Sequence, residues 1–297
     1  MATMLLLFAL LDARPADASP PLWEYRAPST SVAVAQPVPA LGLGSWTAIA
    51  PSQVISYYAF VPLTLGQPAA GCEPIPGVAY GTLDVAGDPT DRPAALHADL
   101  NLALRGYEVT DAYAGLVDYG GGNDSGAPQL YTLFSDERVP AFPAVYQVYD
   151  WDWGCNCRGD LLAYPEVTLA GMGVAPGEVL HLPDSGYNIG DGYEALVLYA
   201  TEERITLKYT LEDNVVRGYT VHVENVCVEP SLLALYQKWN EAGRGRLPAL
   251  RGGQPFGRAL GGAIGVAIRD TGTFMDPRAR QSWWQAKQRL TIERISW

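Results

Sequence analysis

Short runs of strand-forming residues, broken at close intervals by turn-forming residues, are the feature that most constrains the fold of this chain. The 297 residues include 31 Gly and 23 Pro, which interrupt helices and end strands. Runs with the β-branched, aromatic or alternating pattern of strands occur at residues 54–61, 97–104, 144–149, 195–200, 204–209, 219–224 and 264–269. The sequence therefore predicts a mainly β protein.

Helical periodicity is confined to a few segments. Residues 230–242 place apolar side chains at helical spacing, and Pro230 suits the first turn of a helix. Residues 280–290 predict a short helix that carries Trp283 and Trp284, which we expect to pack against the chain's own acidic body.

Composition divides the chain into successive parts. We expect a signal peptide at residues 1–18, a Pro/Ala-rich linker at 19–45 and an N-terminal β-sandwich-like module at 46–175. An antiparallel β-domain with the one short interior helix follows at 176–278, and a basic, Trp-containing tail at 279–297.

The N-terminal segment has features of a secretory signal. An apolar run at residues 4–11 precedes the small-residue site Ala16-Asp17-Ala18, and it is too short to span a bilayer. We therefore expect a secreted or cell-surface protein whose mature chain has no transmembrane segment. No Lys or Arg precedes the apolar run, so an uncleaved anchor remains an alternative.

The charge balance excludes one class of partner. The formal net charge is −12. Contacts with phosphate groups require a positive surface, so we expect no nucleic-acid partner.

Four cysteines, Cys72, Cys155, Cys157 and Cys227, fit two disulfides in an oxidising compartment. Because one residue separates Cys155 from Cys157, we expect these two to pair with different partners, Cys72 and Cys227. Such bonds would join the two halves of the chain, although the connectivity stays open. A zinc knuckle is not indicated, since no second Cys pair lies nearby.

Three segments of the C-terminal region carry a resemblance. Residues 184–189 read DSGYNI, residues 247–257 read LPALRGGQPFG, and residues 268–277 read IRDTGTFMDP. In this order they resemble motifs of the lysostaphin-like zinc peptidases, the M23 family, which cut peptide cross-links in bacterial cell walls. The resemblance covers about residues 176–278 and implies an M23-peptidase-like fold there.

The resemblance also implies a zinc site, held by a His and an Asp of the first motif and a His of a final His-x-His pair. Three protein ligands leave a position for the attacking water, whose pKa the metal lowers. At these positions the chain has Asp184, Asn188, Ala263 and Gly265. Ala and Gly offer no ligand atom, and Asn is a poor zinc ligand. We therefore expect no catalytic residue and no cofactor.

A degenerate groove could still bind a ligand. We expect Asp184, Asn188, His181, His222 and Glu224 to line it. His222 and Glu224 share one face of a predicted strand. A zinc site relocated to His181, His222 and either Asp184 or Glu224 would make the protein a cell-wall metallohydrolase. Alternatively, both histidines are strand residues with ordinary hydrogen bonds.

Acids and tryptophans alternate at residues 150–153, which read DWDW. On a strand, Trp151 and Trp153 would share one face, with both Asp side chains on the other. If exposed, the pair would form an aromatic platform for sugar rings or peptide. If buried, it would fill the core beside the disulfides with the acids in solvent, and we favour this second arrangement. Paired carboxylates alone do not establish a glycosidase.

A second oxygen-rich segment surrounds the triple glycine at residues 120–122. Asp118, Asn123 and Asp124 could bind Ca²⁺ there, although ordinary turn chemistry explains the same residue types.

The leading hypothesis is an exported, non-catalytic protein that binds peptidoglycan, another glycan or a peptide in the degenerate groove. The alternatives are the zinc metallohydrolase with its relocated site, and a structural surface or assembly protein.

Overall fold

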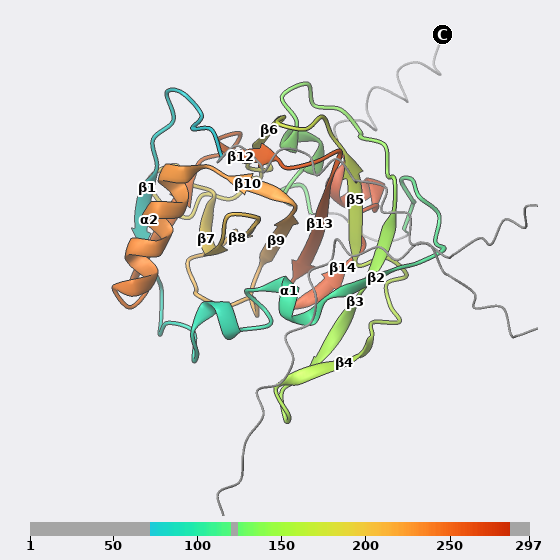
Figure 1. Ribbon diagram of the computed structural model, residues 1–297, viewed down its shortest axis with the longest axis horizontal. Helices are drawn as coiled ribbons and strands as arrows, with labels where there is room; N and C mark the ends of the chain where they lie inside the picture. The colour runs from blue at the N-terminus through green and yellow to red at the C-terminus, as the bar shows by residue number, and fades with distance from the viewer. Residues whose placement is uncertain (1–71, 120–123, 286–297) are drawn as a thin grey trace, which may run out of the picture. The chain divides into compact units, whose positions relative to one another are not determined.

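The computed structural model describes residues 72–119 and 124–285. They form an eleven-stranded and a three-stranded sheet, in which all strand pairs are antiparallel (Figure 1). The predicted mainly β class is confirmed. The signal segment, the linker and the strand predicted at 54–61 lie outside the described residues.

The larger sheet contains strands from both ends of the described chain. Its spatial order is β1 (Gly81–Asp84), β11 (Arg246–Leu250), β7 (Ala195–Ala200), β8 (Arg204–Lys208), β9 (Tyr219–Glu224), β13 (Ala263–Asp270), β5 (Leu169–Gly173), β3 (Val145–Asp152) and β2 (Tyr107–Val109). Beside this path, β14 (Thr273–Met275) pairs with β13, and β4 (Cys157–Leu161) pairs with β3. The smaller sheet consists of β10 (Val226–Val228), β12 (Pro255–Ala259) and β6 (Val179–His181).

The larger sheet continues across the boundary predicted between residues 175 and 176. β5 and β3 precede this boundary, whereas β13 follows it, and β13 pairs directly with β5 at Val266 and Ala170. The predicted β-module and β-domain therefore share one sheet in the described part of the chain.

Most of the predicted strands that the structure describes are confirmed. β7 and β9 have the predicted bounds, and β3, β8 and β13 differ from prediction by a few residues at their ends. Every residue of β7 and β9 is buried. A strand covered on both faces reads as a continuous apolar run, which explains the sequence ALVLYA of β7.

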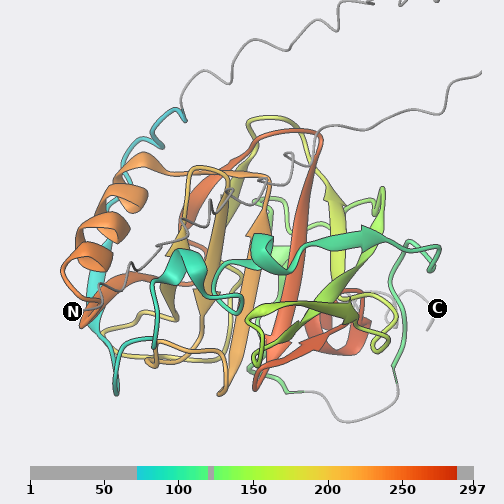
Figure 2. The ribbon, with the colours of Figure 1, turned by 60° about the horizontal axis from the view of Figure 1, so that its bottom comes forward.

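The strand predicted at 97–104 is wrong. His97 O accepts hydrogen bonds from the N–H groups of Leu100 and Asn101, so the backbone turns. The Asn101 side chain then caps α1 (Leu102–Arg105) by accepting from Ala103 N. The alternation does identify buried positions, since Leu100 and Leu102 are buried, but local side-chain capping determines the backbone. Together with the 3₁₀ turn η1 (Ala94–Leu96), this segment crosses one face of the sheet (Figure 2).

The predicted interior helix is confirmed as α2 (Pro230–Glu241), which packs on β11 and β7 (Figure 1). The residue that caps it is Glu229, whose carboxylate accepts from the N–H groups of Ser231 and Leu232. Among the described residues, none of the helices has the length and apolar character needed to cross a membrane.

The start of the tail belongs to the core. Trp283, in α3 (Arg280–Trp283), and Trp284 are buried. Their indole N–H groups donate to the carbonyls of Asp276 and Pro277 at 2.8 and 3.0 Å. Between β2 and β3, the 3₁₀ turn η2 (Leu130–Leu133) adds buried leucines to the same core.

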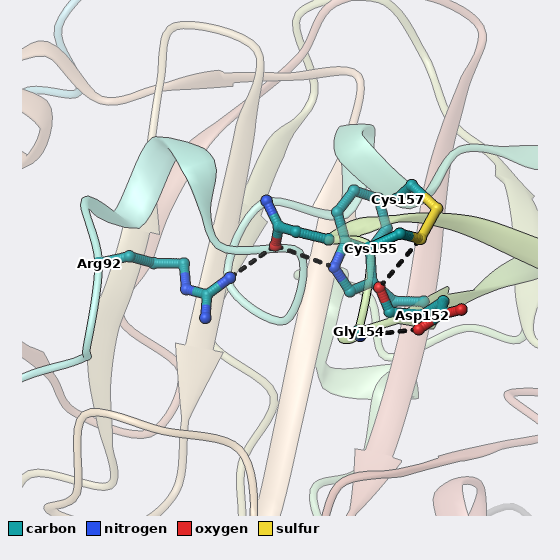
Figure 3. Close-up of a disulfide and its surroundings, with 7 residues drawn as sticks. Arg92, Asp152, Gly154, Cys155 and Cys157 are labelled. Carbon is teal, nitrogen blue, oxygen red and sulfur yellow. Dashed lines mark hydrogen bonds between the residues drawn. A yellow bond between two sulfur atoms is a disulfide. The ribbon is translucent and has the colours of Figure 1, made fainter.

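The predicted disulfide pairing is wrong. Cys72 pairs with Cys227, and Cys155 pairs with Cys157, with Cα–Cα distances of 5.6 and 5.3 Å. The prediction assumed that residues two apart cannot reach one another. At the β3–β4 turn, however, Asn156 adopts a left-handed conformation (φ 52°), and this bend brings its two neighbours within disulfide distance. Figure 3 shows this bond at the hairpin tip.

The two disulfides should differ in their effect on stability. Cys72–Cys227 joins residues 155 apart, whereas Cys155–Cys157 joins residues two apart. Loop-closure entropy predicts that removing the first with C72A/C227A lowers the free energy of unfolding by roughly 5 kcal/mol, and removing the second with C155A/C157A by roughly 1.5 kcal/mol. Urea unfolding of both double variants measures this difference. Equal losses would contradict it.

Candidate functional site

Two of the three motifs that carry the peptidase resemblance meet in the structure. Gly253 N donates to Leu182 O, and Leu182 N donates to Gln254 O, so the glycine turn lies directly against the segment that leads to Asp184. Asn188 faces its own loop, where its Oδ1 accepts from the N–H groups of Gly190 and Gly192.

The residues at the family's metal positions do not fit zinc. Asn188 Oδ1 is engaged by backbone donors, and Ala263 and Gly265 have no ligand atoms. Gly265 stands opposite Glu224 on β9, and a side chain added there would meet Leu169 and Glu224. Within residues 72–119 and 124–285, no group of three or more His, Cys, Asp or Glu side chains has an arrangement that could hold a metal ion.

His222 is a buried structural residue. Thr206 Oγ1 donates its hydrogen to Leu100 O at 2.7 Å and lies 3.0 Å from His222 Nδ1, so Nδ1 carries the hydrogen and donates to Thr206. Burial, assisted by the charge of Arg269, lowers the pKa of His222 to about 3. The ring is therefore neutral at ordinary pH. It stacks on Phe274.

Glu224 is also buried, in an ion pair with Arg204 at 3.0 Å between Oε2 and Nε. The other predicted groove residues lie elsewhere. His181 is half-buried on β6, in the smaller sheet, and its charge acts on the neighbouring Asp184. The predicted groove residues thus separate into a buried pair on β9 and a second group, in which Asp184 and Asn188 are exposed and His181 is half-buried.

Sequence reasoning missed Glu194, which lies beside Asp184. Both carboxylates face Gly252, where a side chain would collide with them. Burial raises the pKa of Asp184, as does the nearby charge of Glu137, and burial likewise raises the pKa of Glu194. Glu194 Oε2 accepts from the backbone N–H and the hydroxyl of Ser185 at 2.7 and 2.9 Å. Nothing in the sequence indicated that the Asp184 and Glu194 carboxylates lie side by side, since the two residues belong to no common motif.

The calcium prediction stays a prediction. Asp118 Oδ1 accepts from Arg280 Nε at 3.0 Å, and Asp124 Oδ2 accepts from the hydroxyls of Tyr187 and Tyr219. Asn123 lies outside the described residues.

The predicted aromatic pair is at the surface, at the tip of the β3–β4 hairpin. Trp153 is 45% exposed and Trp151 is half-buried, and their ring centroids are 6.4 Å apart. The favoured expectation that this pair fills the core is therefore wrong. A large apolar side chain that remains exposed beside another is a feature of binding surfaces.

Two side chains from the segment before α1 complete this surface. The guanidinium of Arg92 lies 5.0 Å from the centroid of the Trp153 ring, and the His97 ring meets Trp153 edge-on at 5.2 Å. Asn156 links the two sides: its Oδ1 accepts from Arg92 at 2.6 Å and from the Trp151 indole at 3.4 Å (Figure 3). We call Trp151, Trp153, Arg92, His97 and Asn156 the hairpin-tip platform.

Asp99 holds the segment before α1, which carries Arg92 and His97, on the larger sheet. Its Oδ1 accepts from Arg105 at 2.8 Å and from Arg269, on β13, at 2.7 Å. Arg105 also donates to Tyr149 O on β3 at 3.3 Å, and the Asp99 N–H donates to His97 Nδ1 at 3.1 Å. Burial alone would raise the pKa of Asp99, but the charges and hydrogen bonds of the two arginines outweigh it and lower the pKa.

A separate pocket of about 250 Å³ lies between Tyr164, Phe274, Met275 and Trp283. Its volume is below the roughly 300–1,000 Å³ of most small-molecule sites. No predicted site residue lines it.

Comparison of the chain with protein-family models, with curated proteins and with solved structures gave no match. The peptidase resemblance therefore stays a prediction.

Replacing Asp99 should destabilise the protein in a pH-dependent way. D99N removes the carboxylate that two buried guanidinium groups share and leaves Arg105 only its longer contact with Asp150 at 3.5 Å, so we expect a loss of about 3 kcal/mol at pH 7. Because the folded-state pKa is lowered, Asp99 stabilises the fold above its ordinary pKa of about 3.9, and this contribution disappears as pH falls through the lowered value. Urea unfolding at pH 7 and pH 3 tests this. A difference between wild type and D99N that is equal at both pH values would contradict it.

Proposed function

We propose that this protein is an exported, non-catalytic carbohydrate-binding protein, which holds sugar rings against Trp153 and Trp151 of the hairpin-tip platform. The observation that carries the proposal is the exposure of Trp153 next to Trp151 on a hairpin tip closed by a disulfide. The flat apolar face of an indole ring suits the C–H face of a sugar, and the indole N–H provides a polar edge.

The polar groups around the platform favour a neutral glycan. Asp91 and Asp150 have exposed carboxylates, and Asp152 is exposed at the turn itself. Carboxylates accept hydrogen bonds from hydroxyl groups. Arg92 is engaged by Asp91 in a bidentate pair at 2.8 and 2.9 Å, so its charge is largely balanced. With a net charge of −12, the chain as a whole repels polyanions.

The proposal keeps the predicted class of ligand but moves its site from the groove to the hairpin tip. His222 and Glu224 are buried and engaged by Thr206 and Arg204, so neither can reach a ligand in solution. The two disulfides and the signal-like residues 4–18 support export, since disulfides persist in oxidising compartments.

Removing one indole ring should weaken binding. We expect wild-type protein to be depleted from solution by at least one of insoluble peptidoglycan, chitin and cellulose. W153A should weaken that retention by at least about tenfold, because aromatic anchors dominate the free energy of binding at such surfaces.

Y113A is the matched control, since Tyr113 is an aromatic residue that is 69% exposed and lies outside the platform. It should bind as the wild type does. Retention on none of the three polysaccharides, or equal retention of W153A and wild type, would contradict the proposal.

A further inference from the structure

The two disulfides differ in their access to solvent. Cys155 and Cys157 are both exposed at the β3–β4 turn, whereas Cys227 is buried on β10 and Cys72 is half-buried. Thiol–disulfide exchange requires a thiolate to reach a sulfur atom, so exposure favours reaction at the hairpin tip.

The Cys155–Cys157 bond can also break without global unfolding. It joins residues two apart within a turn that β3 and β4 already close by strand pairing. Cys72–Cys227 instead connects residues 155 apart, from the start of the described chain to the smaller sheet. A bond that closes a very short loop constrains the unfolded chain little.

The exposed disulfide lies on both sides of Asn156, the residue whose side chain links Arg92 to Trp151. Asn156, at φ 52°, stands between the two cysteines, and its side chain receives the hydrogen bonds of Arg92 and Trp151. The covalent ring through Cys155 and Cys157 thus holds a left-handed backbone conformation that costs free energy outside Gly. Figure 3 shows Arg92 directed toward the tip and the disulfide on its other side.

We infer that Cys155–Cys157 is a redox-active disulfide, which exchanges with external thiols and whose reduction weakens the hairpin-tip platform. The external thiolate of a dithiol attacks one sulfur atom, the S–S bond breaks, and the other cysteine leaves as a thiolate that takes up a proton. The second thiol of the reductant then attacks the mixed disulfide. The reductant leaves as its own disulfide, and two electrons and two protons remain on Cys155 and Cys157.

The reduced tip has a new local partner. Cys155 Sγ lies 3.6 Å from Asp152 O, so the thiol formed on reduction can donate to this carbonyl. Cys155 is then held by β3 rather than by Cys157, and Asn156 is free to leave its left-handed conformation.

Native-state trapping tests the exchange without reference to any glycan. The folded protein is equilibrated with graded ratios of reduced to oxidised dithiothreitol, free thiols are alkylated, and the modified peptides are identified by mass. We expect Cys155 and Cys157 to be alkylated at ratios that leave Cys72 and Cys227 disulfide-bonded. Alkylation of all four cysteines together, or of Cys72 and Cys227 first, would overturn the inference.

The effect on the platform rests on the proposed function and needs its own measurement. Reduction of the tip alone should lower retention on the polysaccharide about tenfold, and C155S/C157S should match the reduced wild type whatever the redox state of the buffer. N156G, which tolerates φ 52° but lacks the acceptor, should bind weakly with its disulfide intact.

The outcomes separate the two ideas. If oxidised wild type is retained on none of peptidoglycan, chitin and cellulose, the proposed function fails while trapping still decides the exchange. If the oxidised and reduced forms are retained equally, control of the platform by the disulfide is contradicted.

Discussion

The geometry of the hairpin-tip platform depends on one buried ion network, in which the Asp99 carboxylate binds Arg105 and Arg269. Arg105 and Arg269 are both buried, and each would be strongly unfavourable there without an anionic partner. Their guanidinium groups lie 5.5 and 4.6 Å from the Phe274 ring, which fills the space beneath them. Through these contacts Asp99 ties the central strand β13 to the segment that crosses the sheet. That segment brings His97 and Arg92 against Trp153, so a buried ion network determines the geometry of an exposed surface.

Strand positions could be predicted where burial determines them. Every residue of β7 and β9 is buried, and the bounds of both strands follow from sequence alone. The run of β7 is apolar throughout because both of its faces are covered, whereas β9 alternates apolar residues with Thr220, His222 and Glu224. Residues 97–104 alternate as a strand does, yet capping by Asn101 and the hydrogen bonds to His97 O turn the backbone. Periodicity reports which side chains are buried, and it does not report which local hydrogen bonds compete with strand pairing.

The candidate site was predicted only in part, for a related reason. The alternation of residues 150–153 identified Trp151 and Trp153, but exposure depends on where β3 ends, and β3 ends at Asp152, just before Trp153. Arg92 and His97 carried no signal, because they reach the platform through tertiary contacts, and Asn156 gave none because its role depends on the conformation of the turn. The disulfide pairing failed because the left-handed conformation of Asn156 cannot be inferred from the Cys-x-Cys spacing. Likewise, the structure brings Asp184 beside the glycine turn, and nothing in the peptidase-like motifs indicated that Glu194 accompanies it.

The fold and the proposed function are linked by the position of the hairpin. β3 pairs with β5 and β2 at its start, whereas its end extends with β4 alone (Figure 1). Strand pairing therefore fixes the base of the hairpin, and the tip depends on its disulfide and on Asn156. The aromatic side chains of the tip therefore lie beyond the part of β3 that pairs with β2 and β5.

The most direct test of this account follows the indole N–H signals of the tryptophans by NMR while a soluble oligosaccharide of the retained polysaccharide is added. Trp283 and Trp284 are buried and serve as internal references. The account predicts that the signals of Trp151 and Trp153 shift with saturation and that those of Trp283 and Trp284 do not. Unchanged Trp151 and Trp153 signals, with shifts confined to the backbone of Gly252 and Gly253 beside Asp184, would place the ligand in the groove and contradict the account.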